Sequence, residues 1–305
     1  MNFQQLRSIR EAIRSDFNLT DAADTLFTSQ PGVSRQIREL EEELGVEIFV
    51  RTGKRLTGLT EPGRDIATII DRLLQERDNL RCAAEDHFNR SEGRLIIATT
   101  HTQARYVLPA AIINFRARFP EVTLALQQAS PQQVAQSLRE GRADIGFASG
   151  VLDNQPDLCS FKAYSWSHRV LVPIGHPLAS RTDLKLSDIV QYPIVTYEEG
   201  FTGRQRIDQA FRDAGLSPNV VLTAMDADVM KTYVRLGLGI GILAEVAYEP
   251  DRDQDLVLLH QFDLIPSNSA MLAVRKGVFM RSFGISLINL VAPDYSEKTI
   301  REMLS

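Results

Sequence analysis

The chain has 305 residues, enough for two domains, and its 24% charged and 44% hydrophobic residues are ordinary for a globular protein. A net charge of −5 does not exclude nucleic-acid binding, because phosphate contacts depend on where the basic groups lie and not on their total. No apolar run reaches the roughly 20 residues of a membrane helix, and the first residues lack the apolar core of a signal peptide. We therefore expect a cytoplasmic protein without a membrane partner.

Residues 2–14 predict a helix that braces a pair of short helices further along the chain. In that pair, Thr20 can cap the first helix, and either Thr28 or Ser29 can cap the second. Gly45 can end the second helix, because glycine readily adopts the left-handed conformation found just beyond helix ends. The stretch therefore has the pattern of a helix-turn-helix.

The second helix of the pair has two different faces. Val33, Ile37, Leu40 and Leu44 recur every three or four residues, so they should share the face that packs on the partner helix. The opposite face near the helix start carries polar and basic groups that can reach base edges in the major groove of DNA. The residues predicted to contact DNA from this helix and its start are Thr28, Ser29, Gln30, Pro31, Ser34, Arg35 and Arg38.

Two short strands are expected after this helix. Residues 46–50 are mainly apolar, and residues 56–60 can form the partner strand of a hairpin. The tip between them is basic, and we expect Arg51, Lys54 and Arg55 to contact DNA phosphates. The helix pair and the hairpin together predict a winged helix-turn-helix.

Short motifs in this region resemble the N-terminal winged helix-turn-helix of LysR-type transcriptional regulators. They are Ala22-Ala23, Ser29-Gln30-Pro31, Val33-Ser34, Leu40-Glu41, Leu44-Gly45, Phe49, Arg51 and Leu59-Thr60 followed by Gly63. The similarity extends over the whole chain. It implies double-stranded promoter DNA and RNA polymerase as partners, and a homotetramer built as a dimer of dimers.

A long helix is expected from residue 61 to about residue 89. The apolar seam predicted along it consists of Ile66, Ile70, Leu73, Leu80 and Ala84. Such a helix spans roughly 40 Å and extends beyond its own domain, so a dimer seam is favoured over packing within the chain. The LysR-type resemblance also implies that this helix links and dimerises the protein. Residues 89–93 after it are predicted to form a hinge.

From residue 94 onward, short apolar strands alternate with helices, which indicates mostly parallel sheets covered by helices. The pattern resembles a periplasmic-binding-protein fold of two αβ subdomains, with crossings near residues 162 and 268. We therefore expect an α/β fold class with an N-terminal winged helix-turn-helix. The predicted segments are residues 1–60 for DNA binding, 61–92 for the linker helix and hinge, 93–162 with 268–305 for subdomain I, and 163–267 for subdomain II.

Three loops with hydroxyl side chains lie at predicted helix starts that can face the cleft between the subdomains. Free N–H groups and the helix dipole attract an anion at such positions, although plain helix capping by serine and threonine is the alternative. Neutral donors there suit a small, fully ionised oxyanion or a carboxylate. The predicted effector-binding residues are Thr100, His101, Thr102, Gln103, Ser130, Thr196, Phe201, Thr202 and Gly203.

Three segments of the effector region resemble the sulfur-assimilation branch of the LysR family, the CysB and Cbl regulators. They are TTHTQARY at residues 99–106, GFTGR at 200–204 and DADVMKTYVRLGLGIG at 226–241, while MNFQQL at 1–6 and IFVRTGKR at 48–55 are similar to Cbl and the SsuR regulators of sulfonate use. The resemblance implies sulfate, thiosulfate, adenosine phosphosulfate or O- or N-acetylserine as the effector, and no other cofactor. Ala129 departs from the glycine expected in that loop.

Two other functions stay open: a LysR-type regulator that responds to a different small carboxylate, and an enzyme acting on a sulfate or phosphate ester. Against the enzyme, the cleft residues show no nucleophile–base pair and no phosphate-binding loop, and the sequence reveals no acidic partner for His101. The two cysteines and five histidines have no metal-ligand spacing. We therefore expect no catalytic residue and no metal.

Overall fold

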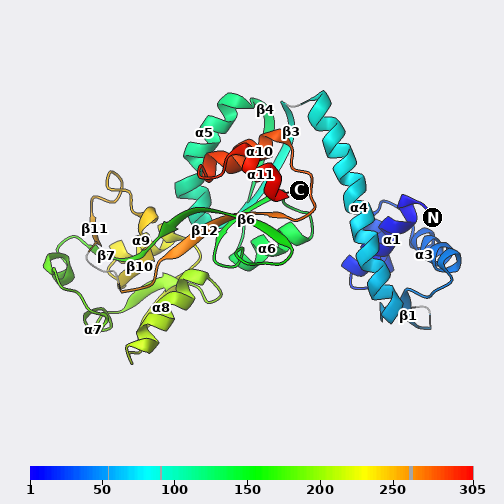
Figure 1. Ribbon diagram of the computed structural model, residues 1–305. Helices are drawn as coiled ribbons and strands as arrows, with labels where there is room; N and C mark the ends of the chain where they lie inside the picture. The colour runs from blue at the N-terminus through cyan, green and yellow to red at the C-terminus, as the bar shows by residue number, and fades with distance from the viewer. Residues whose placement is uncertain (54, 90, 261–263, 305) are drawn as a thin grey trace. The chain divides into compact units, whose positions relative to one another are not determined.

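The computed structural model describes residues 1–53, 55–89, 91–260 and 264–304 (Figure 1). The chain forms two compact units, Met1–Glu85 and Asp86–Ser305, and each is described by itself. Among the described residues, no helix is both long enough and apolar enough to cross a membrane.

Three short helices of the first unit share one core with the start of a longer helix, α4 (Glu61–Phe88). They are α1 (Phe3–Arg14), α2 (Leu19–Thr25) and α3 (Gln30–Leu44), and their buried side chains include Ile9, Val33, Ile37 and Leu40. Leu44 was expected on the same face, but it is 42% exposed because the last turn of α3 runs beyond this core. The apolar periodicity of the helix pair is thus correct for all but its last position.

The helix ends follow local chemistry with one correction. Ser29 caps α3, as predicted, and its Oγ accepts a hydrogen bond from the Gly32 N–H at 3.3 Å. The cap of α2 is Asn18 and not Thr20, because the Asn18 side chain accepts the Thr20 N–H at 3.0 Å. Gly45 ends α3 in the left-handed conformation with φ +71°.

The hairpin after α3 consists of β1 (Phe49–Thr52) and β2 (Arg55–Leu59), which pair antiparallel. The first strand begins three residues later than expected and is irregular between Val50 and Arg51. Lys54, a predicted phosphate contact at the tip, lies outside the described residues.

Helix α4 (Glu61–Phe88) begins where Thr60 Oγ1 accepts the Gly63 N–H at 2.9 Å. Ile70 is 3% exposed in the core of the first unit, and Ile66 packs against that core. These two residues therefore pack within their own domain, contrary to the predicted seam, because the start of α4 lies against the helix-turn-helix. Leu73 and Leu80 are exposed, and so is Ala84.

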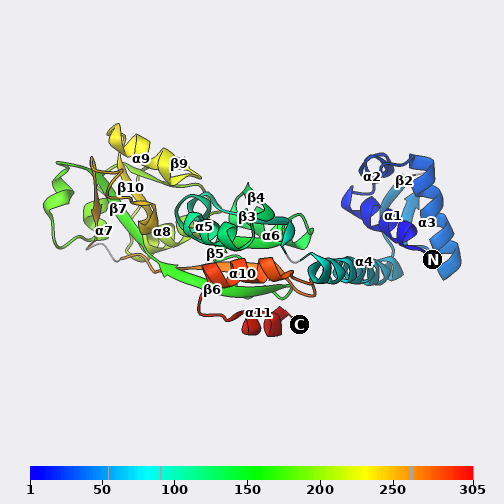
Figure 2. The same ribbon diagram turned by 90° about the horizontal axis from the view of Figure 1, so that it is seen from above.

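The second unit contains two sheets, and the first of them organises subdomain I. Its strand order is β4-β3-β5-β12-β6, with β3, β4 and β5 parallel and β12 antiparallel to its neighbours. Helices α5 and α10 lie on one face, with α11 against α10, and α6 covers the other face (Figures 1 and 2). The strand bounds are β3 (Glu92–Thr99), β4 (Glu121–Gln128), β5 (Ile145–Ser149), β6 (Leu158–Trp166) and β12 (Asn268–Arg275), and the helix bounds are α5 (Leu108–Arg118), α6 (Pro131–Arg139), α10 (Ser282–Val291) and α11 (Glu297–Leu304).

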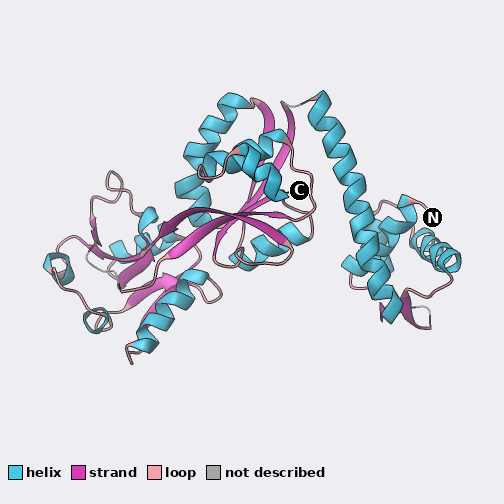
Figure 3. Cartoon of the chain, viewed as in Figure 1, coloured by secondary structure: helices cyan, strands magenta, loops and turns pink. Residues whose placement is uncertain are grey.

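The second sheet organises subdomain II, with the strand order β11-β7-β10-β8-β9. Figure 3 shows the strands of the chain in magenta and the helices in cyan. Its core includes Val170, Phe211 and Ile242, all fully buried. The strands are β7 (His168–Pro173), β8 (Ile194–Tyr197), β9 (Val220–Ala224), β10 (Ile240–Ala244) and β11 (Leu256–Leu259), and the helices are α7 (Leu186–Ile189), α8 (Thr202–Asp213) and α9 (Ala227–Arg235), with short 3-10 turns η2 (Pro177–Ser180) and η3 (Glu245–Ala247).

The chain first crosses between the sheets at Ser167, later than the predicted position near residue 162. The cause is β6, which was not predicted and which stays in the first sheet as far as Trp166 by pairing with Asn268 of β12. The helical stretch after β3 is irregular: η1 (Gln103–Val107) is a π-helical turn, and α5 follows it. This turn places residues 100–107 at the boundary between the subdomains.

Candidate functional site

The start of α3 offers a polar surface for DNA. Arg35 has a side chain that is 81% exposed and forms an ion pair with Glu39 one turn later, at 2.7 Å. The predicted contacts that are exposed are Thr28, Ser29, Gln30, Pro31, Arg35, Arg38 and Arg55, while Ser34 is half-buried. Sequence reasoning missed Phe27, which is 98% exposed in the turn before α3 with φ +52°.

Arg51 has a structural role that the sequence did not reveal. Its Nη2 lies 2.6 Å from Glu41 Oε2, and Glu41 Oε1 accepts the Ile48 and Phe49 N–H groups. This arrangement ties the end of α3 to the first strand of the hairpin. The Arg51 guanidinium thus has a partner within the protein, and its contact with a phosphate stays a prediction, as does that of Arg55, which is exposed on β2.

A cavity of about 30 Å³ lies between subdomains I and II. A single water molecule needs about 10–15 Å³ on the same measure, so the cavity admits a small ligand. The lining residues are Thr100, Thr102, Gln103, Pro131, Ser149, Trp166, Tyr197, Phe201, Thr202 and Gly203. None of them is an acid, a lysine, an arginine or a histidine, so the walls offer only neutral groups.

The structure brings six of the nine predicted effector residues to this cavity: Thr100, Thr102, Gln103, Phe201, Thr202 and Gly203. The other three do not line it. Ser130 caps α6 by accepting the Gln133 N–H, and Thr196 donates to the Ile242 carbonyl inside the sheet at 2.9 Å. His101 turns to an acidic residue instead. Ser130 therefore acts as a helix cap, and its contact with an effector stays a prediction.

Four lining residues were missed: Pro131, Ser149, Trp166 and Tyr197. Ser149 and Tyr197 are the last residues of β5 and β8, so the rule that ligands bind at the carboxyl ends of strands could have found them. Trp166 ends β6, a strand that the sequence did not reveal. Pro131 directly follows the predicted Ser130.

The start of α8 at the cavity has no side-chain cap. Phe201 precedes α8 in an extended conformation, whereas Thr102, just before η1, is itself helical and does not mark a helix start. The first backbone N–H groups of α8 therefore have no partner within the helix and face a site that an anion can occupy. At α6, by contrast, Ser130 already satisfies this need.

Hydrogen bonds between side chains shape the cavity wall. Thr202 Oγ1 donates to the Ser149 carbonyl at 2.9 Å, which joins the two subdomains, and Gly150 leaves room because a Cβ there would lie 2.8 Å from Thr202 Oγ1. Tyr164 donates its hydroxyl to Gln103 Oε1 at 2.8 Å. This bond orients the amide so that its NH₂ group is available to a ligand. Burial raises the pKa of Tyr164 to about 12, so the hydroxyl stays protonated at neutral pH.

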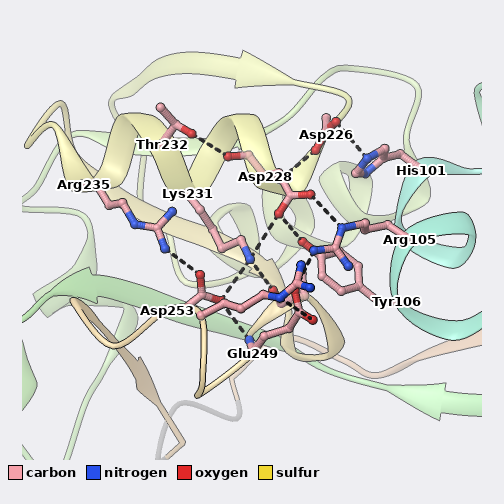
Figure 4. Close-up of polar contacts among 12 residues, drawn as sticks. His101, Arg105, Tyr106, Asp226, Asp228, Lys231, Thr232, Arg235, Glu249 and Asp253 are labelled. Carbon is pink, nitrogen blue, oxygen red and sulfur yellow. Dashed lines mark hydrogen bonds and ion pairs between the residues drawn. The ribbon is translucent and has the colours of Figure 1, made fainter. Parts of the chain in front are cut away.

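A charged network joins the subdomains beside the cavity (Figure 4). His101 Nε2 lies 2.9 Å from Asp226 Oδ2, so His101 has the acidic partner that the sequence did not reveal. Tyr106 donates its hydroxyl to Asp228 Oδ1 at 2.6 Å, and Arg105 lies 2.9 Å from Glu249. Residues 101–106 of subdomain I thereby attach to α9 and η3 of subdomain II.

Lys231 is the buried centre of this network. It is 2% exposed, and its Nζ lies 3.0 Å from Asp253 Oδ2 and 2.9 Å from the Ala247 carbonyl. Arg235 contacts the other oxygen of Asp253 at 2.6 Å. Burial by itself raises the pKa of Asp253, but the Glu249 N–H and the two cations outweigh it and hold this pKa below its ordinary value.

His101, Asp226 and Asp228 offer three possible metal-ligand atoms within 4.8 Å of one another. Asp228 is already engaged by the Tyr106 hydroxyl, by Arg105 at 3.4 Å and by Lys231 at 3.2 Å. A metal ion would have to displace these groups and would face two cations. The arrangement therefore acts as an ion-pair network between subdomains.

Two protein families match the chain. The bacterial regulatory helix-turn-helix protein family of the lysR type matches residues 3–64, and the LysR substrate binding domain matches residues 88–282. The second match includes the cavity and the charged network, and the first includes α3 and the hairpin.

Relatives are similar over the full chain. The HTH-type transcriptional regulator SsuR of Burkholderia cenocepacia is 53% identical, with 100% of this chain and 99% of the relative covered. The regulator cbl of Escherichia coli is 49% identical, with 100% and 96% covered. The crystal structure of the cofactor-binding domain of the Cbl transcriptional regulator has a TM-score of 0.67 and 43% identity, and covers 70% of this chain and 94% of that one.

The fold is shared with full-length OxyR of Pseudomonas aeruginosa, for which the TM-score is 0.69 and the sequence identity is 22%. The comparison covers 96% of this chain and 98% of that one. The sequence relatives are transcriptional regulators, so the enzyme alternative is set aside. The chain belongs to the LysR family of transcriptional regulators, with a winged helix-turn-helix for DNA and a substrate-binding domain of two αβ subdomains.

Proposed function

We propose that the chain activates genes for sulfur assimilation or for the use of sulfonates and sulfate esters, under the control of a small sulfur-related anion. The observation that carries this proposal is the cavity between the subdomains, which is lined by neutral hydrogen-bonding groups and includes the uncapped start of α8. The names of the relatives SsuR and Cbl support a place in the sulfur-related branch.

The chemistry of the wall favours a fully ionised oxyanion. Hydroxyl, amide and backbone N–H groups donate hydrogen bonds to such an ion, and no lining carboxylate is present to accept a proton from it. Sulfate is fully ionised at neutral pH, whereas phosphate retains a proton that needs an acceptor. The small cavity also favours sulfate or thiosulfate over adenosine phosphosulfate, and the acetylserines or another carboxylate are the alternatives.

The DNA partner is engaged by α3 and the hairpin, in a dimer formed along α4. Leu73 and Leu80 are 40% and 73% exposed on α4, so they are available to a second copy. Two such dimers would form the tetramer, and two-fold pairing would set DNA half-sites about one helical turn, or a multiple of it, apart. Promoter-bound tetramers would then act on RNA polymerase.

A ligand panel tests the effector class. Calorimetry with sulfate, thiosulfate, adenosine phosphosulfate, O-acetylserine, N-acetylserine, phosphate and benzoate should show saturable binding of a sulfur oxyanion and none of phosphate. Trp166 is the single tryptophan and lines the cavity, so its fluorescence provides a second signal. Binding of benzoate alone would replace the sulfur effector by another carboxylate.

Two arginine variants test the DNA surface. Arg35→Ala removes an exposed group at the reading helix and should relax sequence preference, while Arg55→Ala should weaken all sequences and lower the salt dependence by about one unit of slope. Binding titrations on specific and random DNA at several salt concentrations measure both effects. Equal losses on both DNAs for both variants would contradict the assignment.

A further inference from the structure

A buried histidine lies directly behind the cavity wall. His168 begins β7, is 0% exposed, and has its ring centroid 4.7 Å from that of Trp166 and 6.3 Å from that of Tyr197. Both of these rings line the cavity, as does Gly203. A Cβ on Gly203 would lie 2.8 Å from His168 Nε2, so glycine at this position lets the imidazole approach the wall closely.

The imidazole of His168 has unused hydrogen-bonding capacity. Neither Nδ1 nor Nε2 has a hydrogen-bond partner among the residues that the structure describes. A buried polar group without a protein partner is costly and calls for a physical explanation. Burial lowers the pKa of His168 to about 3, with a smaller contribution from Arg206, so the ring is neutral at neutral pH when the cavity holds no anion.

The charges around His168 leave room for an anion to change its protonation. Arg206 on α8 disfavours the protonated ring, and Tyr197 on β8 keeps a neutral hydroxyl because burial raises its pKa to about 12. Glu245, which follows β10, is paired with Arg169 of β7 at 3.2 Å. An anion in the cavity would be separated from the His168 ring only by the residues of the cavity wall. In this poorly solvated region, its negative charge favours the protonated imidazolium form of the ring.

We propose that His168 takes up a proton when an anion enters the cavity, so that effector binding is coupled to protonation of this buried imidazole. The inference rests on the proposed anion site. The proton comes from solvent, adds to the unprotonated ring nitrogen, and returns to solvent when the anion leaves. Because the anion-bound form holds the proton more tightly, the affinity for the anion rises as pH falls.

Proton uptake can be measured directly. Sodium sulfate is added to the full chain in a weakly buffered solution at about pH 5.5, and the acid needed to hold the pH is recorded, with thiosulfate as a second probe. The wild type should take up between about half a proton and one proton per anion bound, and its affinity should rise by up to about tenfold for each unit of pH decrease. His168→Phe, which keeps a ring beside Trp166 and Tyr197, should bind the anion without proton uptake and with little pH dependence.

Two further variants locate the proton. His176→Gln is the matched control, since His176 caps the distant turn η2, and it should show the same proton uptake as the wild type. His168→Gln provides a second test if His168→Phe does not fold. Anion binding without proton uptake, or uptake that persists in both His168 variants or disappears in His101→Gln, would overturn the proposal while leaving the anion site intact. Failure of both sulfate and thiosulfate to bind would instead contradict the proposed function itself, and this inference with it.

Discussion

Subdomains I and II meet at an uncharged cavity and at a network of paired charges. One segment, residues 100–106, contributes to both. The cavity takes Thr100, Thr102 and Gln103 from this segment and has uncharged walls. Directly after them, Arg105 and Tyr106 enter a network of paired charges (Figure 4). A cation that already holds a carboxylate is not free for a ligand, whereas an uncapped helix start is. Subdomain attachment and anion recognition should therefore be separable by mutation.

The largest expected effect is on the charged side of this comparison. Lys231→Ala removes one of the two cations that pair with Asp253, a residue that is only 1% exposed. The free energy of unfolding of the effector domain should therefore fall by about 3–5 kcal/mol. Urea unfolding followed by Trp166 fluorescence measures this loss. Lys298→Ala is the matched control, because Lys298 is 87% exposed, and it should change nothing measurable. A loss in Lys231→Ala as small as in this control would remove the network from the account.

The next effect is on the neutral side. Thr100→Val removes a hydroxyl from the cavity wall and one hydrogen bond to a charged ligand, worth about 1.5–3 kcal/mol, or about tenfold to a hundredfold in anion affinity. Folding and DNA binding should be unchanged. Thr196→Val is the contrasting variant, since its hydroxyl bonds within the sheet and does not line the cavity. It should lower stability and leave anion affinity nearly intact, as calorimetry and unfolding can show side by side.

Acid sharpens the comparison further. The pKa of Asp253 is held below its ordinary value in the folded protein by the Glu249 N–H, Lys231 and Arg235 against the effect of burial. Its contribution to stability is therefore present above the unfolded pKa of about 4 and is lost as pH falls below it. Unfolding measured at about pH 5.5 and about pH 3.5 should show this loss, and Asp253→Asn should reduce the slope. An unchanged slope in that variant would show that other carboxylates cause the acid sensitivity.

The smallest expected effect concerns orientation within the cavity. Tyr164→Phe removes the hydroxyl that holds Gln103 Oε1, so the amide can rotate and its NH₂ group is no longer fixed toward the ligand. Anion affinity should fall by about twofold to tenfold, the equivalent of one neutral hydrogen bond. Calorimetry on Tyr164→Phe beside Gln103→Ala tests the mechanism, because the loss from Tyr164→Phe should disappear when Gln103 is already absent.

The features that depend on near neighbours in sequence could be predicted. Ser29 and Gly45 set the ends of α3 by local hydrogen bonding and backbone conformation. Thr100, Thr102 and Thr202 were found because they lie at or near predicted helix starts. The winged helix-turn-helix and the two αβ subdomains followed from the same patterns and from family resemblance.

Features that depend on sheet order or on distant pairing could not be predicted. Trp166 reaches the cavity only because β6 stays in the first sheet by pairing with β12. Tyr106 meets Asp228 across 122 residues, and no periodicity indicates such a pair. Along α4, the apolar spacing of Ile66 and Ile70 was real, but it could not show that these residues face their own domain.

An anion in the neutral cavity should change how the protein binds DNA if it binds one arrangement of the subdomains more tightly than the other. Only such a difference in affinity can shift the populations of the two arrangements. The direct measurement is footprinting on DNA fragments selected by the protein itself, with and without the anion that binds most tightly, for the wild type and Thr100→Val. We predict that the wild-type footprint changes with the anion, while Thr100→Val binds the same DNA with a footprint that stays constant at that anion concentration. A footprint of Thr100→Val that shifts as in the wild type would contradict the account.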